Sequence, residues 1–222
     1  MRIKAVIFDM NGTIVDDEPL HEEAMRKVCK IHGVELSHEE FAKEYIGRPD
    51  NECFQEIIRR HGVKGVPVNE LMGQKAREYI SFIHDETTPE RLKIVPGVLR
   101  LLKSLQKQFL LALATGARRE EAMAILELFG IKKFFGVIVT VEDVLRGKPD
   151  PEPYQLAVQR LGVRPEECVA IEDSPHGIRS AKRANIYSIG FHNKNYQHDL
   201  SEADLEVSSL SEISVTQITN LS

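Results

Sequence analysis

Seven residues of this chain carry groups suited to phosphoryl chemistry, and most of them directly follow short apolar runs. They are Asp9, Asn11, Thr115, Gly116, Lys148, Glu172 and Asp173. Carboxylate oxygens are the ligands that Mg²⁺ prefers. A hydroxyl, a backbone N–H and an ammonium are suitable donors to phosphate oxygens, and the ammonium also offsets the charge of a transferring phosphoryl group. The set therefore predicts a site that holds a phosphoryl group beside Mg²⁺.

Each of these residues alone has a more ordinary explanation. An Asp after a strand is usually a helix cap or a turn residue, a Thr-Gly pair is usually a turn, and Lys148, which precedes a proline, would usually be solvated. Their occurrence together, in order, after successive apolar runs favours a site. By contrast, the run Asp16, Asp17 and Glu18 is interpreted as charge at a helix N-terminus, not as a set of metal ligands.

Five continuous apolar runs predict the strands that position these groups. They span residues 5–8, 109–114, 137–139, 169–171 and 186–189. Continuous runs are typical of strands buried on both faces, which is the usual condition of a parallel sheet. Helical patterns fill most gaps between the runs, so we expect an α/β fold with a Rossmann-like parallel sheet core. In such a sheet ligands bind beyond the carboxyl ends of the strands.

Residues 15–92 are the exception, because no run there predicts a strand. Three apolar stripes at helical spacing occupy the segment: Leu20, Ala24, Val28 and Ile31; Phe54, Ile57 and Ile58; and residues 71–83. We therefore expect an all-helical cap domain at 15–92, inserted into an α/β catalytic core formed by residues 1–14 and 93–222. Residues 207–222 predict a last short strand and a helix.

The composition excludes several classes of protein. A net charge of -5, from 29 basic and 34 acidic residues, gives no general attraction to nucleic acid or to an anionic membrane. The three cysteines have no CxxC spacing, so they are interpreted as core residues of a protein in a reducing compartment. Only four apolar residues in a row precede Asp9, too few for a signal peptide. We expect a cytoplasmic monomer whose partner is a small phosphorylated metabolite.

Four segments, FDMNGT, LALATG, GKPDP and IEDSPHGIRSAKRA, resemble in order the four motifs of the haloacid dehalogenase superfamily of phosphotransferases. The helical insert after the first motif is similar to the cap of the subgroup that contains β-phosphoglucomutase and phosphoglycolate phosphatase. The resemblance implies that Asp9 is the nucleophile that becomes an aspartyl phosphate, and that Thr115 and Lys148 hold the phosphoryl oxygens. It also implies Mg²⁺ bound by Asp9, Asp173 and the backbone carbonyl of Asn11, with Glu172 in or near the metal shell.

Asn11 departs from the family pattern, in which a phosphatase carries a second aspartate at this position. That aspartate protonates the leaving group and then takes a proton from the attacking water, which an amide does not do. Loss of general acid/base catalysis costs about 10² to 10⁴ in rate, so we expect impaired activity with metal binding preserved. An engineered Asp-to-Asn change is the favoured origin, ahead of a natural slow or non-catalytic homologue and of a natural Asn11 that deamidates before Gly12.

Substrate choice is assigned to the insert and to the loop after the second motif. The candidate residues are His21, Gly47, Arg48, Lys75 and Ala117. His21 and Lys75 match positions that contact substrate in the β-phosphoglucomutase subgroup, and Gly47 begins a GxxxxE pattern typical of its specificity loop. The alternative for the cap candidates is a solvated helix residue. The mutase binds a second phosphate with an Arg three residues after the loop glycine, where this chain has Asp50, so a phosphatase is favoured.

The sequence thus predicts a Mg²⁺-dependent phosphatase of small phosphorylated metabolites, sugar phosphates above all, that is impaired at Asn11. Two alternatives stay open. A phosphosugar mutase would release an isomerised sugar phosphate instead of inorganic phosphate. A non-catalytic homologue would bind phosphorylated metabolites tightly and remain inactive even with Asp restored at position 11.

Overall fold

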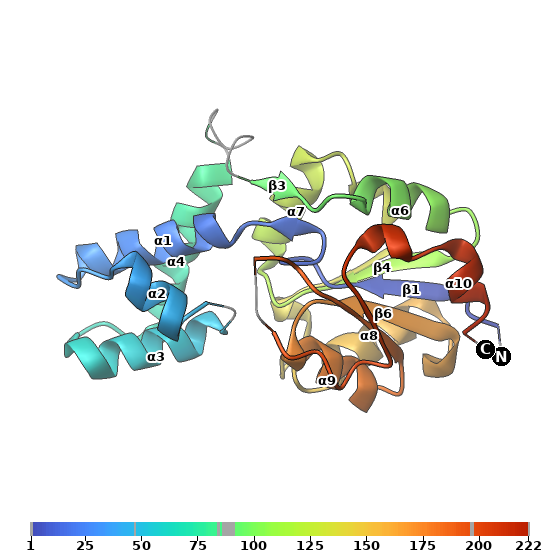
Figure 1. Cartoon of the computed structure of the whole chain (residues 1–222). Helices are drawn as coiled ribbons and strands as arrows, with labels where there is room; N and C mark the ends of the chain where they lie inside the picture. The colour runs from blue at the N-terminus through green and yellow to red at the C-terminus, as the bar shows by residue number, and fades with distance from the viewer. Residues whose placement is uncertain (1, 47, 84, 86–91, 196–197, 222) are drawn as a thin grey trace. The chain divides into compact units, whose positions relative to one another are not determined.

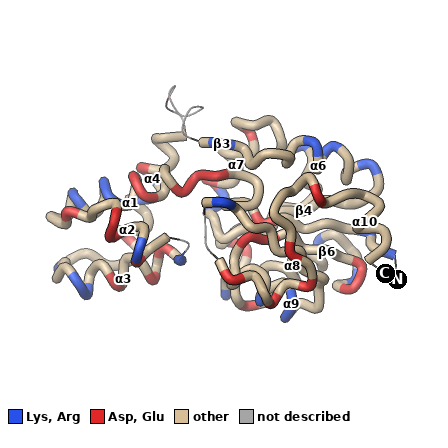
Figure 2. The backbone as a smooth tube through the Cα atoms, in the orientation of Figure 1, with Lys and Arg blue, Asp and Glu red and all other residues tan. Residues whose placement is uncertain are grey.

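The computed structural model describes residues 2–46, 48–83, 85, 92–195 and 198–221. It divides into two compact units, one formed by Met1–Asp16 with Ile94–Ser222 and the other by Asp17–Lys93. The first unit contains the large sheet and the second is built from helices (Figure 1). Acidic and basic residues are interspersed along both units (Figure 2), so neither carries charge of a single sign.

A parallel sheet of six strands forms the centre of the first unit, in the order β5-β4-β1-β6-β7-β8. Its strands are β1 Ala5–Phe8, β4 Leu110–Ala114, β5 Val137–Val139, β6 Cys168–Glu172, β7 Tyr187–Phe191 and β8 Leu205–Val207. Phe8 of β1 is in register with Leu113 of β4 and with Ile171 of β6. The carboxyl ends of these three strands therefore meet at one edge, and the predicted α/β fold is confirmed.

Helices cover both faces of this sheet. In Figure 1, α6 Val98–Leu105 and α7 Arg119–Leu128 lie on one face, and α8 Glu152–Leu161 and α9 Pro175–Arg183 lie on the other. Short 3₁₀ segments in the described part of the chain contribute to the connections: η1 Lys132–Phe134, η2 Val141–Asp143, η3 Pro165–Glu167 and η4 Leu210–Glu212. Ala5 and Ile7 of β1 pack in the core on the α8 side. Because successive side chains alternate along a strand, Val6 and Phe8 face the α6 side, and β1 is buried on both faces.

Two details of the sequence prediction are wrong. A short ladder joins β2 Val15–Asp16 to β3 Lys93–Ile94, although no strand was expected between residue 15 and residue 109. Strands of two residues are too short to show periodicity, so the pattern missed them. The last strand, β8, ends at Val207, where the tail was expected to begin, while the expected final helix is present as α10 Val215–Thr219.

The described residues of the second unit form α1 Glu18–Ile31, α2 His38–Glu44, α3 Asp50–His61 and α4 Val68–Ile83. Its apolar core includes Val28, Phe54 and Ile57, as the helical stripes predict. Ile31, assigned to the first stripe, is instead 62% exposed at the end of α1, where the helix has passed the core. All three cysteines are buried and free, as expected of core residues.

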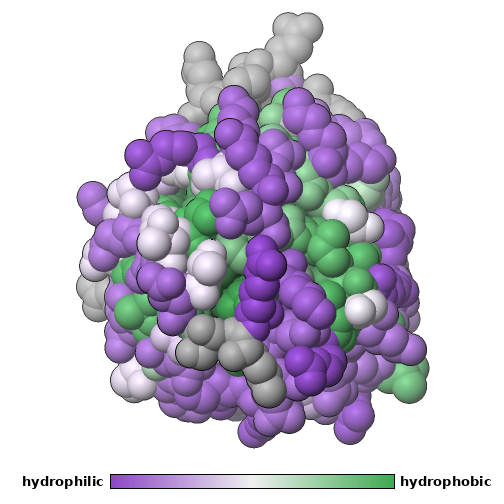
Figure 3. All heavy atoms as spheres, turned by 90° about the vertical axis from the view of Figure 1, so that its right-hand side faces the viewer, coloured by the Kyte–Doolittle hydropathy of each residue, from purple (hydrophilic) through white to green (hydrophobic). Residues whose placement is uncertain are grey.

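Two surface properties concern possible partners. No helix among the described residues has the length and apolar character needed to span a membrane. On the face drawn in Figure 3, hydrophobic side chains lie in patches between hydrophilic ones.

Candidate active site

Asp9 follows the central strand of the sheet directly. Its backbone N–H donates to the Ile171 carbonyl at 3.0 Å, which continues the β1–β6 ladder by one residue. The residue is only 7% exposed. A carboxylate held at this depth by main-chain hydrogen bonding has little freedom to move, which suits a group that must meet a reacting atom in one geometry.

The turn after Asp9 brings the chain back over the sheet edge. The Met10 carbonyl accepts hydrogen bonds from the N–H groups of Ile14 and Val15, at 2.7 and 3.1 Å. Gly12 has a φ of +80°, and a Cβ built on it would lie 2.0 Å from Asp173 Oδ2. Glycine is therefore required twice, once for the backbone conformation and once for the approach of Asp173.

Lys148 joins two of the carboxylates. Its Nζ lies 2.5 Å from Asp9 Oδ1 and 2.5 Å from Glu172 Oε1, and its side chain is 11% exposed. Burial alone would lower the pKa of this ammonium, but the charges of Asp9 and Glu172 and their hydrogen bonds raise it well above its ordinary value. Lys148 therefore carries a positive charge throughout the physiological pH range. The alternative interpretation of Lys148 as a solvated surface residue is wrong, because its side chain is largely buried.

Glu172, at the end of β6, is fully buried and held by three donors. Besides Lys148, the Tyr154 hydroxyl donates to Oε1 at 2.6 Å and the Ser174 hydroxyl donates to Oε2 at 3.3 Å. Burial and then the Glu172 charge raise the pKa of Tyr154 well above its ordinary value, so its hydroxyl stays protonated as a donor. These contacts fix the orientation of the Glu172 carboxylate.

Asp173 completes an acidic cluster. Carboxylate oxygens of Asp9, Glu172 and Asp173 lie within 4.8 Å of one another, and all three residues are buried. Burial, followed by repulsion from Asp9 and Glu172, raises the pKa of Asp173 well above its ordinary value, although the Thr13 hydroxyl donates to Oδ1 at 3.3 Å. Three carboxylates beside one ammonium leave an excess of negative charge that a divalent cation would neutralise.

Thr115 lies beyond the carboxyl end of β4, and its side chain is next to Asn11. Its hydroxyl is 3.4 Å from Asn11 Oδ1 and accepts the Ala117 N–H at 3.0 Å. The residue is buried, whereas Gly116 beside it is exposed and Ala117 is half-buried. The structure thus brings a hydroxyl, the residue 11 amide and a loop with an accessible backbone to the edge where the acidic cluster lies.

Sequence reasoning missed three polar residues that support this site. Tyr154 belongs to the apolar stripe of α8, and its hydroxyl contact with Glu172 has no signal in the pattern. Asn193 Nδ2 donates to the Gly12 carbonyl at 2.7 Å, and His198 Nδ1 donates to the Asp173 carbonyl at 2.8 Å. Both lie beyond the end of β7, so attention to the polar residues after that strand would have found them.

The helical unit has a polar network of its own, which links two of the predicted specificity residues. Lys75 Nζ lies 2.6 Å from His21 Nδ1 and 2.7 Å from Asp50 Oδ2, and Lys75 is 2% exposed. The solvated alternative for Lys75 is therefore wrong. Because an ammonium only donates, His21 Nδ1 is the acceptor, and the ring proton lies on Nε2.

Asp17 accepts a hydrogen bond from the Nε2–H of His21 and so completes the network. His21 Nε2 donates to Asp17 Oδ2 at 3.1 Å, the Tyr79 hydroxyl donates to the same oxygen, and the rings of His21 and Tyr79 stack at 4.3 Å. Asp17 is the N-cap residue of α1, but its side chain makes no cap hydrogen bond. Asp17 thus lies at the helix N-terminus as expected, and its buried carboxylate also accepts hydrogen bonds from two side chains.

The other cap candidates are not part of this network. Arg48 is exposed; it donates to the Glu44 carbonyl at 2.9 Å and lies 3.7 Å from Glu52. These contacts are those of a surface residue. Gly47, the first residue of the GxxxxE pattern, lies outside the described residues.

The fold is a parallel α/β core with an inserted helical unit, and residues of the four motifs meet at the carboxyl edge of its sheet. A family model described as haloacid dehalogenase-like hydrolase matches residues 6–191, and the chain belongs to this family.

Similar proteins extend over nearly the same length. A phosphorylated carbohydrates phosphatase from Thermotoga maritima is 37% identical over 191 residues, 84% of each chain. Crystal structures of an Asp-to-Asn mutant of CbbY from Rhodobacter sphaeroides with xylulose-(1,5)bisphosphate and of β-phosphoglucomutase from Clostridium difficile superpose with TM-scores of 0.86 and 0.81, at 26% and 28% identity. They cover 99% and 97% of this chain and 100% and 95% of their own.

Proposed function

We propose that this chain is a Mg²⁺-dependent phosphatase of small phosphorylated metabolites, principally sugar phosphates, that acts through an aspartyl phosphate on Asp9. The observation that carries the proposal is the contact of one buried ammonium, Lys148, with both Asp9 and Glu172 in a cluster that also contains Asp173. The Thermotoga phosphatase, 37% identical, supports phosphorylated carbohydrates as the substrate class.

The cluster fits Mg²⁺ in number and kind of donors. Its oxygens come from three buried carboxylates, and the single ammonium among them leaves net negative charge. We assign Mg²⁺ to Asp9, Asp173 and the backbone carbonyl of Asn11, with Glu172, which already accepts three protein donors, at the edge of the shell. The bound ion would supply positive charge to the phosphoryl oxygens.

Asp9 would act as the nucleophile. One of its carboxylate oxygens forms a bond to phosphorus while the bond from phosphorus to the sugar oxygen breaks, and the phosphoryl group passes to the protein. Thr115, the Gly116 N–H and Lys148 would hold the phosphoryl oxygens, and the Lys148 charge offsets the negative charge of the transferring group. Water then breaks the acyl phosphate and regenerates Asp9.

Asn11 would limit both steps. The departing sugar oxygen needs a proton, and the attacking water must lose one, but an amide supplies neither transfer at neutral pH. Its Oδ1, 3.4 Å from the Thr115 hydroxyl, leaves it able to position groups without moving protons. We therefore expect slow turnover with phosphate binding intact; the CbbY structure shows an Asp-to-Asn mutant of a similar protein with a bisphosphate bound.

We assign selection of the leaving group to His21 and Lys75, with Gly47, Arg48 and Ala117 as further candidates. A buried Lys75 paired with Asp50 is costly to maintain for stability alone, which supports a role in recognition. The carboxylate of Asp50 would repel a second phosphate, so we favour a phosphatase over a mutase. The cytoplasmic location and the monomeric state stay predictions.

The decisive assay compares this chain with Asn11→Asp over a panel of phosphorylated metabolites, with Mg²⁺ and with a chelator. Release of inorganic phosphate by Asn11→Asp, dependent on Mg²⁺, supports the phosphatase. An isomerised product without inorganic phosphate would establish the mutase instead. Tight binding of substrates by both proteins with no turnover would establish a non-catalytic homologue.

A further inference from the structure

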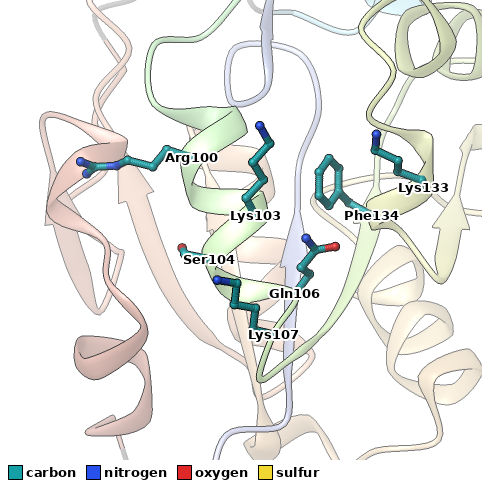
Figure 4. Close-up of a pocket in the computed structure, with 7 residues that line it drawn as sticks. All are labelled: Arg100, Lys103, Ser104, Gln106, Lys107, Lys133 and Phe134. Atoms are coloured by element: carbon teal, nitrogen blue, oxygen red, sulfur yellow. The ribbon is translucent and has the colours of Figure 1, made fainter.

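A second charged concavity lies away from the acidic cluster. It has a volume of about 590 Å³, and four cations line it: Arg100, Lys103, Lys107 and Lys133. In Figure 4, Lys103 and Lys133 lie on either side of Phe134, Lys107 lies on the turn that follows α6, and Arg100 extends from α6 away from Phe134. We refer to this cavity as the basic hollow. No carboxylate lines it, although acidic residues outnumber basic ones in the chain.

One face of α6 supplies most of the charge. Arg100, Lys103 and Lys107 follow one another at intervals of three and four residues, so they lie on one side of the helix and its last turn. Leu101, Leu102 and Leu105, on the other side, are at most 2% exposed. The hydrophobic side of α6 faces the core, and its basic side faces solvent. The basic residues of α6 are the blue segments along this helix in Figure 2.

Ordinary helix electrostatics do not account for this arrangement. Lys103, in the last turn of α6, complements the negative end of the helix dipole, but Arg100 lies in the first turn, where a cation is unfavourable. Lys133 comes from η1, a different element. Arg100 donates to the Ser211 carbonyl at 3.3 Å, and no ion pair joins Lys103, Lys107 or Lys133 to a carboxylate within the described ranges. Among the described residues, these three lysines thus have no carboxylate partner.

The basic hollow is separate from the active site. Lys107 lies three residues before β4, and Lys133 lies four residues before β5, so the hollow is at the amino ends of these strands. Thr115 and the acidic cluster lie at the carboxyl ends. The five residues of β4, at about 3.3 Å each, separate the two by roughly 16 Å. A ligand in the hollow therefore does not contact Asp9.

We propose that the basic hollow binds a small polyphosphate, through its phosphate groups alone. Lysine ammonium groups and the Arg100 guanidinium donate to phosphate oxygens, and the Ser104 hydroxyl adds a neutral donor. The volume suits a small ligand. Phe134 is only 8% exposed and lies 5.7 Å from Lys133 Nζ, so its ring forms part of the wall and offers no open face to a nucleobase. The proposal is independent of the proposed function.

Calorimetry with pyrophosphate, tripolyphosphate and ATP, in a chelator and at low salt, tests the proposal. Affinity should rise from pyrophosphate to tripolyphosphate as charge is added, and it should fall with ionic strength. Tripolyphosphate and ATP should bind with similar affinity, because the base gains no contact. A dissociation constant weaker than about 1 mM for tripolyphosphate would overturn the proposal. Tighter binding of a single-stranded oligonucleotide than of tripolyphosphate would replace it with a nucleic-acid site.

Four variants locate the binding. Lys103→Glu/Lys107→Glu should weaken tripolyphosphate binding at least about tenfold, and Lys103→Gln/Lys107→Gln should weaken it less, because neutral side chains do not repel the ligand. Lys30→Glu/Lys64→Glu, the same change of charge on exposed residues of the helical unit, should bind as the parent does. Circular dichroism checks that each variant folds. The Glu and Gln double variants of Lys103 and Lys107 are also compared with Lys148→Ala. If both double variants still bind tripolyphosphate and Lys148→Ala does not, the ligand binds in the active site and the proposal is overturned.

Discussion

Lys148 Nζ lies 2.5 Å from Asp9 Oδ1, so the carboxylate proposed as the nucleophile is paired with the ammonium proposed to bind the phosphoryl group. The same ammonium contacts Glu172 on the neighbouring strand at 2.5 Å. One cation thus compensates part of the repulsion between carboxylates at the ends of β1 and β6. Loss of Lys148 should affect both the stability of the cluster and the transfer of the phosphoryl group.

In an Asn11→Asp background, Lys148→Ala should lower turnover by about 10² to 10³ for every substrate, because its charge acts on the phosphoryl group that all substrates share. Phosphate release measured over several sugar phosphates checks this. Lys182→Ala removes an exposed lysine that pairs with Asp204 at 2.8 Å in the same unit, and it should leave turnover unchanged. A loss confined to one substrate would show that Lys148 recognises the leaving group instead.

Asn11→Asp alone should raise phosphate release from sugar phosphates by about 10² or more, as expected when one general acid/base group is restored. Mass spectrometry of the peptide that contains Asn11 is the control, because deamidation would give the starting protein some of the same activity. Equal rates for the two proteins, with Asn11 intact, would refute the account of proton transfer at this position.

Gly12→Ala should prevent Asp173 from keeping its place, because the new Cβ would overlap Asp173 Oδ2. Gly162→Ala is the matched control: Gly162 has a similar positive φ of +68° but no atom within 4 Å of the added Cβ. The control should lose only about 1 kcal/mol of stability. Thermal melts with and without Mg²⁺ should show a rise in melting temperature for Gly162→Ala and a much smaller one for Gly12→Ala. Equal rises in melting temperature for the two variants would show that Asp173 does not bind the metal.

Glu167 should make the stability of the α/β unit depend on pH in the acid range. Hydrogen bonds from Lys4 and from the backbone and side chain of Arg164 lower the pKa of Glu167 from 4.5 to about 2. A carboxylate with a lowered folded-state pKa contributes stability above its unfolded pKa, and the contribution is lost as the pH falls from about 4.5 towards 2. Glu167→Gln should therefore be less stable than the parent at pH 7 and nearly equal to it at pH 2. Urea melts at the two pH values check this, and a constant difference would contradict it.

His21→Ala, in the Asn11→Asp background, should change the order in which sugar phosphates are preferred while sparing p-nitrophenyl phosphate, whose leaving group needs no polar recognition. His32→Ala is the control, since His32 lies at the end of the same helix, where Nε2 lies 2.8 Å from Gln74 Oε1. Turnover numbers over a panel of sugar phosphates provide the measurement. An unchanged order would assign specificity to the core loops, beginning with Ala117.

The main strands, and the meeting of the candidate site residues at one edge of the sheet, were predictable for one physical reason. Strands buried on both faces must be continuous apolar runs, and parallel strands align their carboxyl ends, so the residues immediately after them must meet. Asp9, Lys148 and Glu172 are far apart in sequence, yet each was identified by the apolar run before it. Asp173 was identified in the same way.

Other features have no local signal. The β2–β3 ladder comprises two residues from each strand, too few for a pattern. Lys75 and Asp17 are charged residues at helical positions, and a sequence pattern treats them as solvated; only tertiary packing places them in one buried network with His21. Tyr154 likewise appears apolar in the stripe of α8, although its hydroxyl serves Glu172.

The most direct test of the proposed mechanism is a search for phosphate bound covalently to Asp9. With p-nitrophenyl phosphate and Mg²⁺, the leaving group departs without a proton, so this chain should form the aspartyl phosphate but hydrolyse it slowly. Rapid mixing should show a burst of p-nitrophenol close to one equivalent, and mass spectrometry should find one phosphoryl group on the peptide that carries Asp9. The absence of both the burst and the modified peptide, under conditions in which Asn11→Asp turns over, would contradict the mechanism.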